Sequence, residues 1–381
     1  MRIRRKISIL LTLCITASIL YGCGTKTGGN VKIISESPSP SDIVDDAYVQ
    51  DGYDIYSKYT YQTLDERQQI YYQCMLNCIL TMDSSVTIEY NDYETMKIAF
   101  EAIRRDYGGL FWVDGFNYET SGNETIFYPI YSMTEDEVRS REGLIEAETE
   151  TILDNIDDAS DYGIAKGIYE YLVENVTYNR NAKNGQNILG VFLENECVCS
   201  GYASATQFLF SLVGIESIIV TGTAGGENHA WNVVNLDGKW YNMDVTFGAT
   251  DYTDKVNYLY MTMTDEVCYM GHTADKIFKL PTCISTDDNY FVKSGSYFTS
   301  ENANELRDFI SDNYSKGQYT MTFLTDSEDS LEYFRTLVLN DSIQELCPGA
   351  TGVSYDVSVG NLVTLSIDTE EKSTELPSGI Q

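Results

Sequence analysis

Apolar and small residues cover nearly all sides of the segment from Tyr202 to Leu212, so we predict that it forms a buried helix. Gly214 follows this segment and can supply a left-handed C-terminal residue. Cys199 therefore falls at the start of a core helix, where unpaired N–H groups and the helix dipole favour a negative charge. The pattern places a cysteine where its thiolate form would be stabilised.

The segment after this helix is predicted to form a β-hairpin. Two apolar strands, 229–235 and 239–247, flank an Asp-Gly turn at 237–238. Antiparallel pairing around that turn brings His229 and Asp244 to the same face, two positions apart. A carboxylate placed there can accept a hydrogen bond from one imidazole nitrogen and stabilise the imidazolium.

The composition leaves few histidines for a cysteine–histidine pair. The chain holds only two, His229 and His272. A histidine beside a cysteine at a helix start lowers the thiol pKa and produces a nucleophile at neutral pH. With Asp244 on one nitrogen of His229, the other nitrogen is left for Cys199.

Three short motifs around these residues resemble those of the transglutaminase-like superfamily. They are VCSGYA at 198–203, HAWN at 229–232 and WYNMDVTF at 240–247. The resemblance implies an α+β fold, with a papain-like transglutaminase core whose nucleophile helix packs on an antiparallel sheet. It also implies a triad with Cys199 as nucleophile, His229 as base and Asp244 as the orienting residue. His272 lies outside the family's order for the base, and we interpret it as a structural or rim residue.

Each of these residues also has an ordinary structural explanation, because free cysteines are often buried. The triad rests on the agreement of helix start, hairpin pairing and motif order. Cys197 stands before the helix start, where no dipole lowers its pKa, and we interpret it as a small space-filling residue. A zinc site with His229 lacks the usual two-residue gap between ligand cysteines, so we expect no metal and no cofactor. Val245 and Phe247 replace the Pro and Trp of many family members, which bears on substrate preference.

The first 45 residues have the features of an exported lipoprotein. Residues 1–22 combine a basic start with an apolar run that is short for a membrane span, as in a signal peptide. The run ends in LYGC, which resembles a lipobox, so Cys23 is the expected lipidation site. An ordinary signal peptide with a chance cysteine and an uncleaved anchor are the alternatives. Residues 23–45 are predicted to form a flexible stalk that holds the protein at the outer face of the cytoplasmic membrane.

The chain is strongly acidic, with 25 basic and 58 acidic residues and a net charge of −33. Such a surface repels nucleic acid and anionic lipid, so we expect no nucleic-acid partner. A preference for cationic peptides and simple solubility both remain open as explanations of this charge.

The cysteine count is compatible with a free thiol. Two of the nine cysteines, Cys14 and Cys23, precede the part that is expected to fold, and the other seven are an odd number. At least one of these is unpaired unless a bridge forms between chains. Cys74 and Cys78 lie one helical turn apart, where a disulfide would be strained, and we interpret them as core thiols.

The remaining pattern divides the chain into four regions. They are an N-terminal α+β region at 46–150, the transglutaminase-like catalytic core at 151–290, a small C-terminal α/β module at 291–368 and a disordered tail at 369–381. Helices are expected at 64–82, 93–105, 134–156, 161–175, 300–314 and 327–346. Strands are expected at 86–90, 110–119, 124–132, 258–262, 318–324, 352–359 and 361–367. We expect the strand at 258–262 to close the core sheet.

These expectations describe an extracytoplasmic cysteine acyl-transfer enzyme that acts on peptide or carboxamide bonds through a thioester acyl-enzyme. Water as the acceptor makes it a peptidase or amidase, with peptide or protein substrates such as cell-wall peptides, and this is the reading we favour. An amine as the acceptor makes it a protein-crosslinking transglutaminase. The third alternative is a non-catalytic surface lipoprotein that binds peptide in the same groove.

Overall fold

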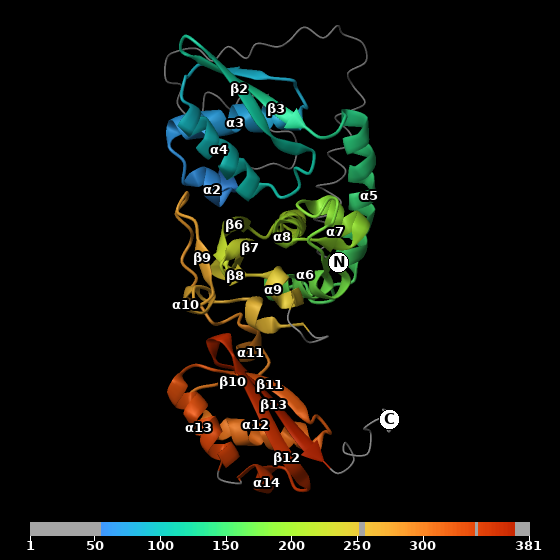
Figure 1. The fold of residues 1–381 in the computed structure, drawn as a ribbon, viewed down its shortest axis with the longest axis vertical. Helices are drawn as coiled ribbons and strands as arrows, with labels where there is room; N and C mark the ends of the chain where they lie inside the picture. The colour runs from blue at the N-terminus through green and yellow to red at the C-terminus, as the bar shows by residue number, and fades with distance from the viewer. Residues whose placement is uncertain (1–54, 251–255, 340–341, 370–381) are drawn as a thin grey trace, which may run out of the picture. The chain divides into compact units, whose positions relative to one another are not determined.

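The computed structural model describes residues 55–250, 256–339 and 342–369 (Figure 1). Contacts between residues divide the chain into two compact units. Unit 1 contains the chain up to Asn257 together with Thr273–Cys283, and unit 2 contains Tyr258–His272 and the chain from Ile284. The domain ranges expected from the sequence stay a prediction.

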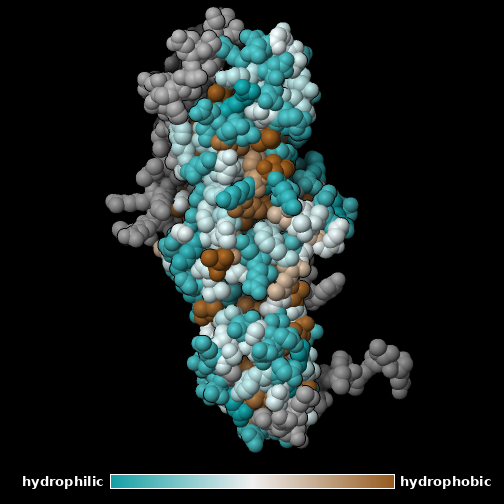
Figure 2. Space-filling model, turned by 90° about the vertical axis from the view of Figure 1, so that its left-hand side faces the viewer, coloured by the Kyte–Doolittle hydropathy of each residue, from teal (hydrophilic) through white to brown (hydrophobic). Residues whose placement is uncertain are grey.

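The predicted signal peptide, Cys23, the stalk and residues 370–381 lie outside the described residues. Within the described ranges, no helix combines the length and the apolar character that crossing a membrane requires. Figure 2 shows a face that is mostly hydrophilic where its residues are described, with small apolar areas. Such a surface is typical of a chain with this many charged side chains.

Helices and a three-stranded sheet form the N-terminal part of unit 1. Helix α3 begins with a capping box, in which the Asp65 carboxylate accepts the Gln68 N–H and the Gln68 side chain accepts the Asp65 N–H. The sheet is antiparallel and has the order β1-β3-β2. The elements of this part are η2 (Ile55–Ser57), α2 (Tyr59–Gln62), α3 (Glu66–Leu80), β1 (Val86–Ile88), α4 (Tyr93–Asp106), β2 (Val113–Ser121) and β3 (Glu124–Tyr131).

The core of unit 1 places helix α8 against a four-stranded sheet of order β8-β7-β6-β9 (Figure 1). Ala203 in α8 packs with Ile219 in β6 and Ala230 in β7, and the short alanine side chains let helix and sheet approach closely. Helix α8 ends at Gly214, which has the predicted left-handed conformation, with φ of 77°. The elements are α5 (Glu135–Asp154), α6 (Asp161–Asn175), β4 (Thr177–Tyr178), α7 (Ile188–Glu194), β5 (Glu196–Cys197), α8 (Cys199–Val213), β6 (Ser217–Ala224), β7 (Glu227–Leu236), β8 (Lys239–Met243), α9 (Val245–Thr250) and β9 (His272–Ala274).

The hairpin of β7 and β8 has the register that its Asp-Gly turn predicts, with Asn232 opposite Met243. The predicted length of the second strand is wrong, because β8 ends at Met243 and helix α9 follows at once. The carboxylate of Asp244 accepts a hydrogen bond from the Phe247 N–H at 3.1 Å. This side chain caps the new helix, and the cap turns the chain out of the sheet.

The predicted strand at 258–262 is also wrong. Its first residues form the 3₁₀-helix η3 (Tyr258–Tyr260) in unit 2. The Tyr258 ring stacks on Tyr290 with ring centroids 3.6 Å apart, and Leu259 packs in an apolar cluster with Phe291 and other residues of unit 2. These long-range contacts decide the local conformation, and the edge of the core sheet beside β6 is formed by β9 instead.

Unit 2 is built around a sheet of order β10-β11-β13-β12. Its helices α12 and α13 contribute to an apolar core in which Phe323 contacts Phe298 and Phe334 edge to face. The helix expected at 327–346 is present as two helices, α13 and α14. The elements are η3, α10 (Asp265–Cys268), α11 (Tyr290–Lys293), β10 (Tyr297–Phe298), α12 (Ala303–Ser315), β11 (Thr320–Thr325), α13 (Glu328–Leu339), α14 (Ser342–Leu346), β12 (Ala350–Ser358), η4 (Val359–Asn361) and β13 (Leu362–Thr369).

Seven cysteines lie in the described part of the chain, and all of them are free thiols. Cys74 and Cys78 are both buried, as expected for core thiols in α3. Cys199 is the one thiol of the seven that is not fully buried.

Candidate active site

Cys199 is the first residue of helix α8 and follows the N-cap residue Val198. Within the described residues, no side chain caps this helix start. The first backbone hydrogen bond of the helix runs from the Tyr202 N–H to the Val198 carbonyl at 3.1 Å. The N–H groups of the first turn therefore remain outside the helical ladder. They make this end of α8 suited to a thiolate or to an oxyanion.

A close backbone contact fixes the position of this helix start. The Val198 N–H donates to the Gly185 carbonyl at 3.0 Å. A Cβ atom at Gly201 would lie 2.5 Å from the same carbonyl oxygen and 2.6 Å from Cys197 Cβ. Glycine at position 201 thus allows the segment before α7 and strand β5 to pack directly against α8.

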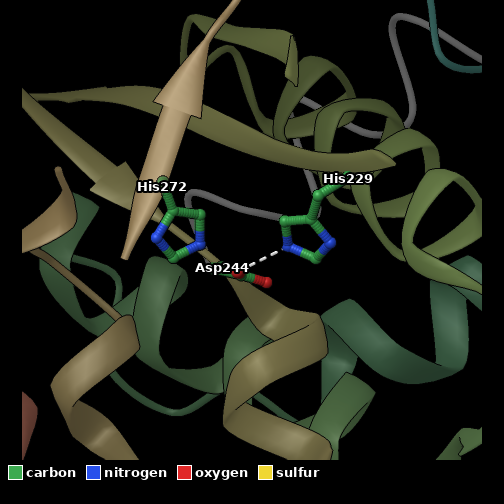
Figure 3. A group of neighbouring side chains, drawn as sticks. All are labelled: His229, Asp244 and His272. Carbon is green, nitrogen blue, oxygen red and sulfur yellow. Dashed lines mark hydrogen bonds and ion pairs between the residues drawn. The ribbon is translucent and has the colours of Figure 1, made fainter. Parts of the chain in front are cut away.

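His229 lies in β7 and Asp244 follows β8 directly. Figure 3 shows the hydrogen bond between them, which joins His229 Nε2 and Asp244 Oδ2 at 2.8 Å. Both side chains are buried, and Asp244 is fully so. The other carboxylate oxygen of Asp244 caps α9, so the local structure holds the carboxylate from two sides. The ring of Phe247 lies against the imidazole, with ring centroids 4.8 Å apart.

The Cys199 thiol lies beside the His229 imidazole, and each of the two side chains shifts the pKa of the other. Burial raises the pKa of the Cys199 thiol, but the hydrogen bond and charge of His229, with N–H groups of Ala230 and Ser200, bring that pKa below its ordinary value. Burial lowers the pKa of His229, but hydrogen bonds and charges of Asp244 and Cys199 raise it to about 9. Both shifts favour a thiolate–imidazolium pair over two neutral side chains.

The neighbouring Cys197 has opposite properties. Its side chain is completely buried in β5, and burial raises the pKa of its thiol. A buried thiol without a basic partner is inert towards electrophiles.

Two polar contacts involve residues close in sequence to Cys199 and His229. The exposed Gln186 accepts a hydrogen bond from the Ser200 hydroxyl through its amide oxygen. Arg180 forms an exposed ion pair at 2.5 Å with Glu227, which lies two residues before His229. Neither contact follows from local sequence, because Arg180 and Glu227 are 47 residues apart in the chain.

His272, which is also labelled in Figure 3, is buried. Its Nδ1 lies 3.0 Å from the carbonyl oxygen of Cys268. A hydrogen bond to a backbone carbonyl one helical turn away is typical of a histidine with a structural role.

Residues 150–245 match the family model of the transglutaminase-like superfamily. The kyphoscoliosis peptidase of Homo sapiens is 23% identical over 154 residues, which cover 36% of this chain and 21% of that protein. The alignment thus spans about a fifth of the length of this curated relative. That protein's mouse counterpart gives the same identity and coverage.

Two solved structures overlap with parts of the chain. One is described as the crystal structure of a TGase, with 16% identity, a TM-score of 0.29 and coverage of 44% of this chain and 52% of that one. The other is a putative cysteine protease from Cytophaga hutchinsonii, with 12% identity, a TM-score of 0.26 and coverage of 42% and 65%. TM-scores this low do not establish a shared overall fold. The family match coincides instead with α6, α8 and the β6–β8 sheet, so residues 150–245 form a transglutaminase-like domain.

Proposed function

We propose that this protein is a cysteine acyl-transfer enzyme that hydrolyses peptide or carboxamide bonds, with Cys199, His229 and Asp244 as its catalytic residues. The observation that carries the proposal is the hydrogen bond between the Asp244 carboxylate and His229, together with a Cys199 thiol at the start of α8 whose pKa the same imidazole lowers. A binding protein has no need of a partly accessible thiol whose pKa is lowered by a buried imidazole. Similarity to a peptidase over part of the chain supports the same reading.

The reaction follows from the protonation state of the pair. The Cys199 thiolate attacks the substrate carbonyl carbon, and the oxygen that becomes negative is stabilised by N–H groups at the start of α8. The His229 imidazolium gives its proton to the leaving amine as the C–N bond breaks, which leaves a thioester on Cys199. Water then gives a proton to His229 and attacks the thioester, which releases the carboxylic acid and restores the Cys199 thiolate beside the imidazolium. Asp244 keeps the imidazole in one orientation throughout.

The first test is the alkylation of Cys199 by iodoacetamide between pH 5 and 10, followed by mass spectrometry of the labelled peptides. We expect one fast site that reacts well below the ordinary thiol pKa of about 8.5. Labelling disappears in Cys199→Ala, slows at pH 6.5 in His229→Ala and is unchanged in the matched control Cys197→Ala. If labelling follows Cys197, or if no thiol is faster than an ordinary exposed one, a non-catalytic binding protein becomes the better account.

The same thioester can pass its acyl group to an amine. Cleavage of fluorescently labelled casein and incorporation of dansylcadaverine into casein separate the two outcomes, because the first uses water and the second an amine as acceptor. We expect cleavage that is lost in Cys199→Ala. Incorporation of the amine without cleavage would instead identify a protein-crosslinking transglutaminase.

We also propose that the protein is exported and anchored as a lipoprotein to the outer face of the cytoplasmic membrane, so that peptides near that surface are its substrates. The support is the basic and apolar N-terminus that ends in LYGC at Cys23. An alkyne-tagged fatty acid supplied to bacteria that produce the full chain should label the wild type and not Cys23→Ala. Equal labelling of both proteins would contradict the anchor.

A further inference from the structure

Asn232 joins the strand that carries His229 to the helix that carries Cys199. It lies in β7, three residues after His229, and its side chain is fully buried. Its amide nitrogen donates a hydrogen bond to the carbonyl oxygen of Ala203 at 3.0 Å. Ala203 lies in α8, one helical turn beyond Cys199. The contact therefore links the two elements close to both reactive side chains.

The same residue also aligns the second strand of the hairpin. Asn232 is directly opposite Met243 in β8, and Asp244 is the next residue along the chain. Ala203 and Ala230 pack together between α8 and β7, and such close packing leaves the helix–strand spacing little room for adjustment. One buried side chain thus contacts the helix of the nucleophile and lies in register with the residue before the orienting carboxylate.

Stability alone does not account for an asparagine at this position. Within the described residues, its amide oxygen is buried without a hydrogen-bond partner. An unsatisfied buried acceptor costs about 1–3 kcal/mol, whereas a leucine of similar size would carry no such cost. The Ala203 carbonyl lies inside a helix, where the helical ladder supplies a donor in any case. Because this polar side chain costs stability, we infer that its hydrogen bond to Ala203 serves the geometry of the site.

We propose that Asn232 is a positioning residue that holds α8 against β7 so that the Cys199 thiol stays next to the His229 imidazole. The inference rests on the proposed catalytic function. It predicts that loss of the amide separates the pair without unfolding the domain. The thiol then loses the neighbouring imidazolium that keeps it ionised at neutral pH.

The test compares Asn232→Leu with a matched control, Gln207→Leu. Gln207 is a second buried amide and also lies in α8. Its nitrogen donates to the Asp106 carbonyl at 2.8 Å, and its oxygen accepts from the Gly108 N–H at 2.6 Å. Both variants remove one buried amide from a contact of α8, but only one removes a contact with the strand of His229. Folding is followed by thermal unfolding, and the site by the pH dependence of iodoacetamide alkylation at Cys199.

We expect Asn232→Leu to unfold at or above the wild-type temperature and to alkylate at least tenfold more slowly at pH 6.5, with its midpoint moved towards the ordinary thiol pKa. Gln207→Leu should unfold at a lower temperature and keep the wild-type midpoint. Asn232→Thr, which suits a strand and cannot reach Ala203, should repeat the shift if the leucine variant does not fold. A folded Asn232 variant with the wild-type midpoint would overturn the inference and leave the proposed function intact. A wild-type enzyme without a low-pH reactive thiol would overturn both.

Discussion

The carboxylate of Asp244 serves two elements at once. Oδ2 accepts a hydrogen bond from His229 and Oδ1 accepts one from the Phe247 N–H. The first contact concerns chemistry, because it selects the imidazole tautomer and stabilises the imidazolium. The second concerns stability, because it caps α9.

Substitution of Asp244 by Asn should separate these two effects. One carbonyl oxygen remains and can still cap α9, so any loss in the free energy of unfolding should come from the weakened contact with the His229 imidazolium and not from the cap. The amide group now offers a donor to His229 Nε2 and favours the wrong tautomer, so kcat for p-nitrophenyl acetate should fall by roughly two to four orders of magnitude. Steady-state kinetics and urea unfolding of the same preparation measure both quantities. Retention of wild-type kcat would remove Asp244 from the catalytic group.

The pKa values of the pair set the pH range of the enzyme. The lowered pKa of Cys199 and the raised pKa of His229, about 9, bracket the range in which both side chains are charged. The folded protein holds the His229 proton more tightly than the unfolded chain does. The resulting stabilisation of the fold is complete below a pH of about 6.5, the pKa of histidine in the unfolded chain. That stabilisation is lost as the pH rises through 9. Thiol reactivity that needs the imidazolium should decline over the same alkaline range.

At the scale of elements, the sequence predicts those parts whose signals are local. The helices at α3, α4, α5, α6 and α8 appear within a few residues of their expected ends, because caps and apolar faces lie within the segments themselves. The Asp-Gly turn sets the register of β7 and β8, and that register brings His229 and Asp244 together. The principal residues of the candidate site could therefore be identified from the sequence.

Contacts between distant segments explain what could not be predicted. Strand β8 ends where the Asp244 carboxylate caps the next helix. The 3₁₀-helix at Tyr258 depends on stacking with Tyr290, a ring 32 residues further along the chain. The bond from Asn232 to Ala203 joins positions 29 residues apart. Asn232 stands inside the HAWN motif, but nothing in the pattern indicates which carbonyl its amide meets.

At the scale of unit 1, the N-terminal part and the core share buried polar contacts. Gln207 of α8 bonds to the backbone at Asp106 and Gly108, and the buried Arg105 pairs with Asp275 at 2.5 Å. A Cβ atom at Gly108 would clash with the Ser204 carbonyl. Helix α8 thus packs against the sheet on one side and against the end of α4 on another.

Asp106 gives this packing a measurable pH dependence. Its side chain is fully buried and accepts hydrogen bonds from the Tyr72 hydroxyl at 2.9 Å and the Tyr61 N–H at 3.2 Å. Burial raises its pKa to about 6, partly offset by these hydrogen bonds. The folded state therefore keeps a proton that the unfolded chain loses near pH 4, and stability falls as the pH rises from about 4 to 6.

Asp106→Asn removes this ionisation while keeping an oxygen that accepts hydrogen bonds. Relative to the wild type, the variant should gain stability between pH 4 and pH 7, by an amount on the order of 3 kcal/mol or less. Thermal unfolding of both proteins at several pH values in this range measures the difference. A difference that stays constant with pH would show that Asp106 ionises at an ordinary pKa.

The distribution of thiols in the described residues has a practical consequence for anyone who works with the protein. Six of these seven thiols are buried, and the seventh is that of the proposed nucleophile, Cys199. In a chain whose Cys14 and Cys23 are replaced by alanine, a reagent that consumes thiols should therefore stop after one equivalent, and activity should be lost in step with that single event. A limiting amount of such a reagent counts the competent molecules in a preparation, and oxidants should inactivate the enzyme by the same one-hit kinetics.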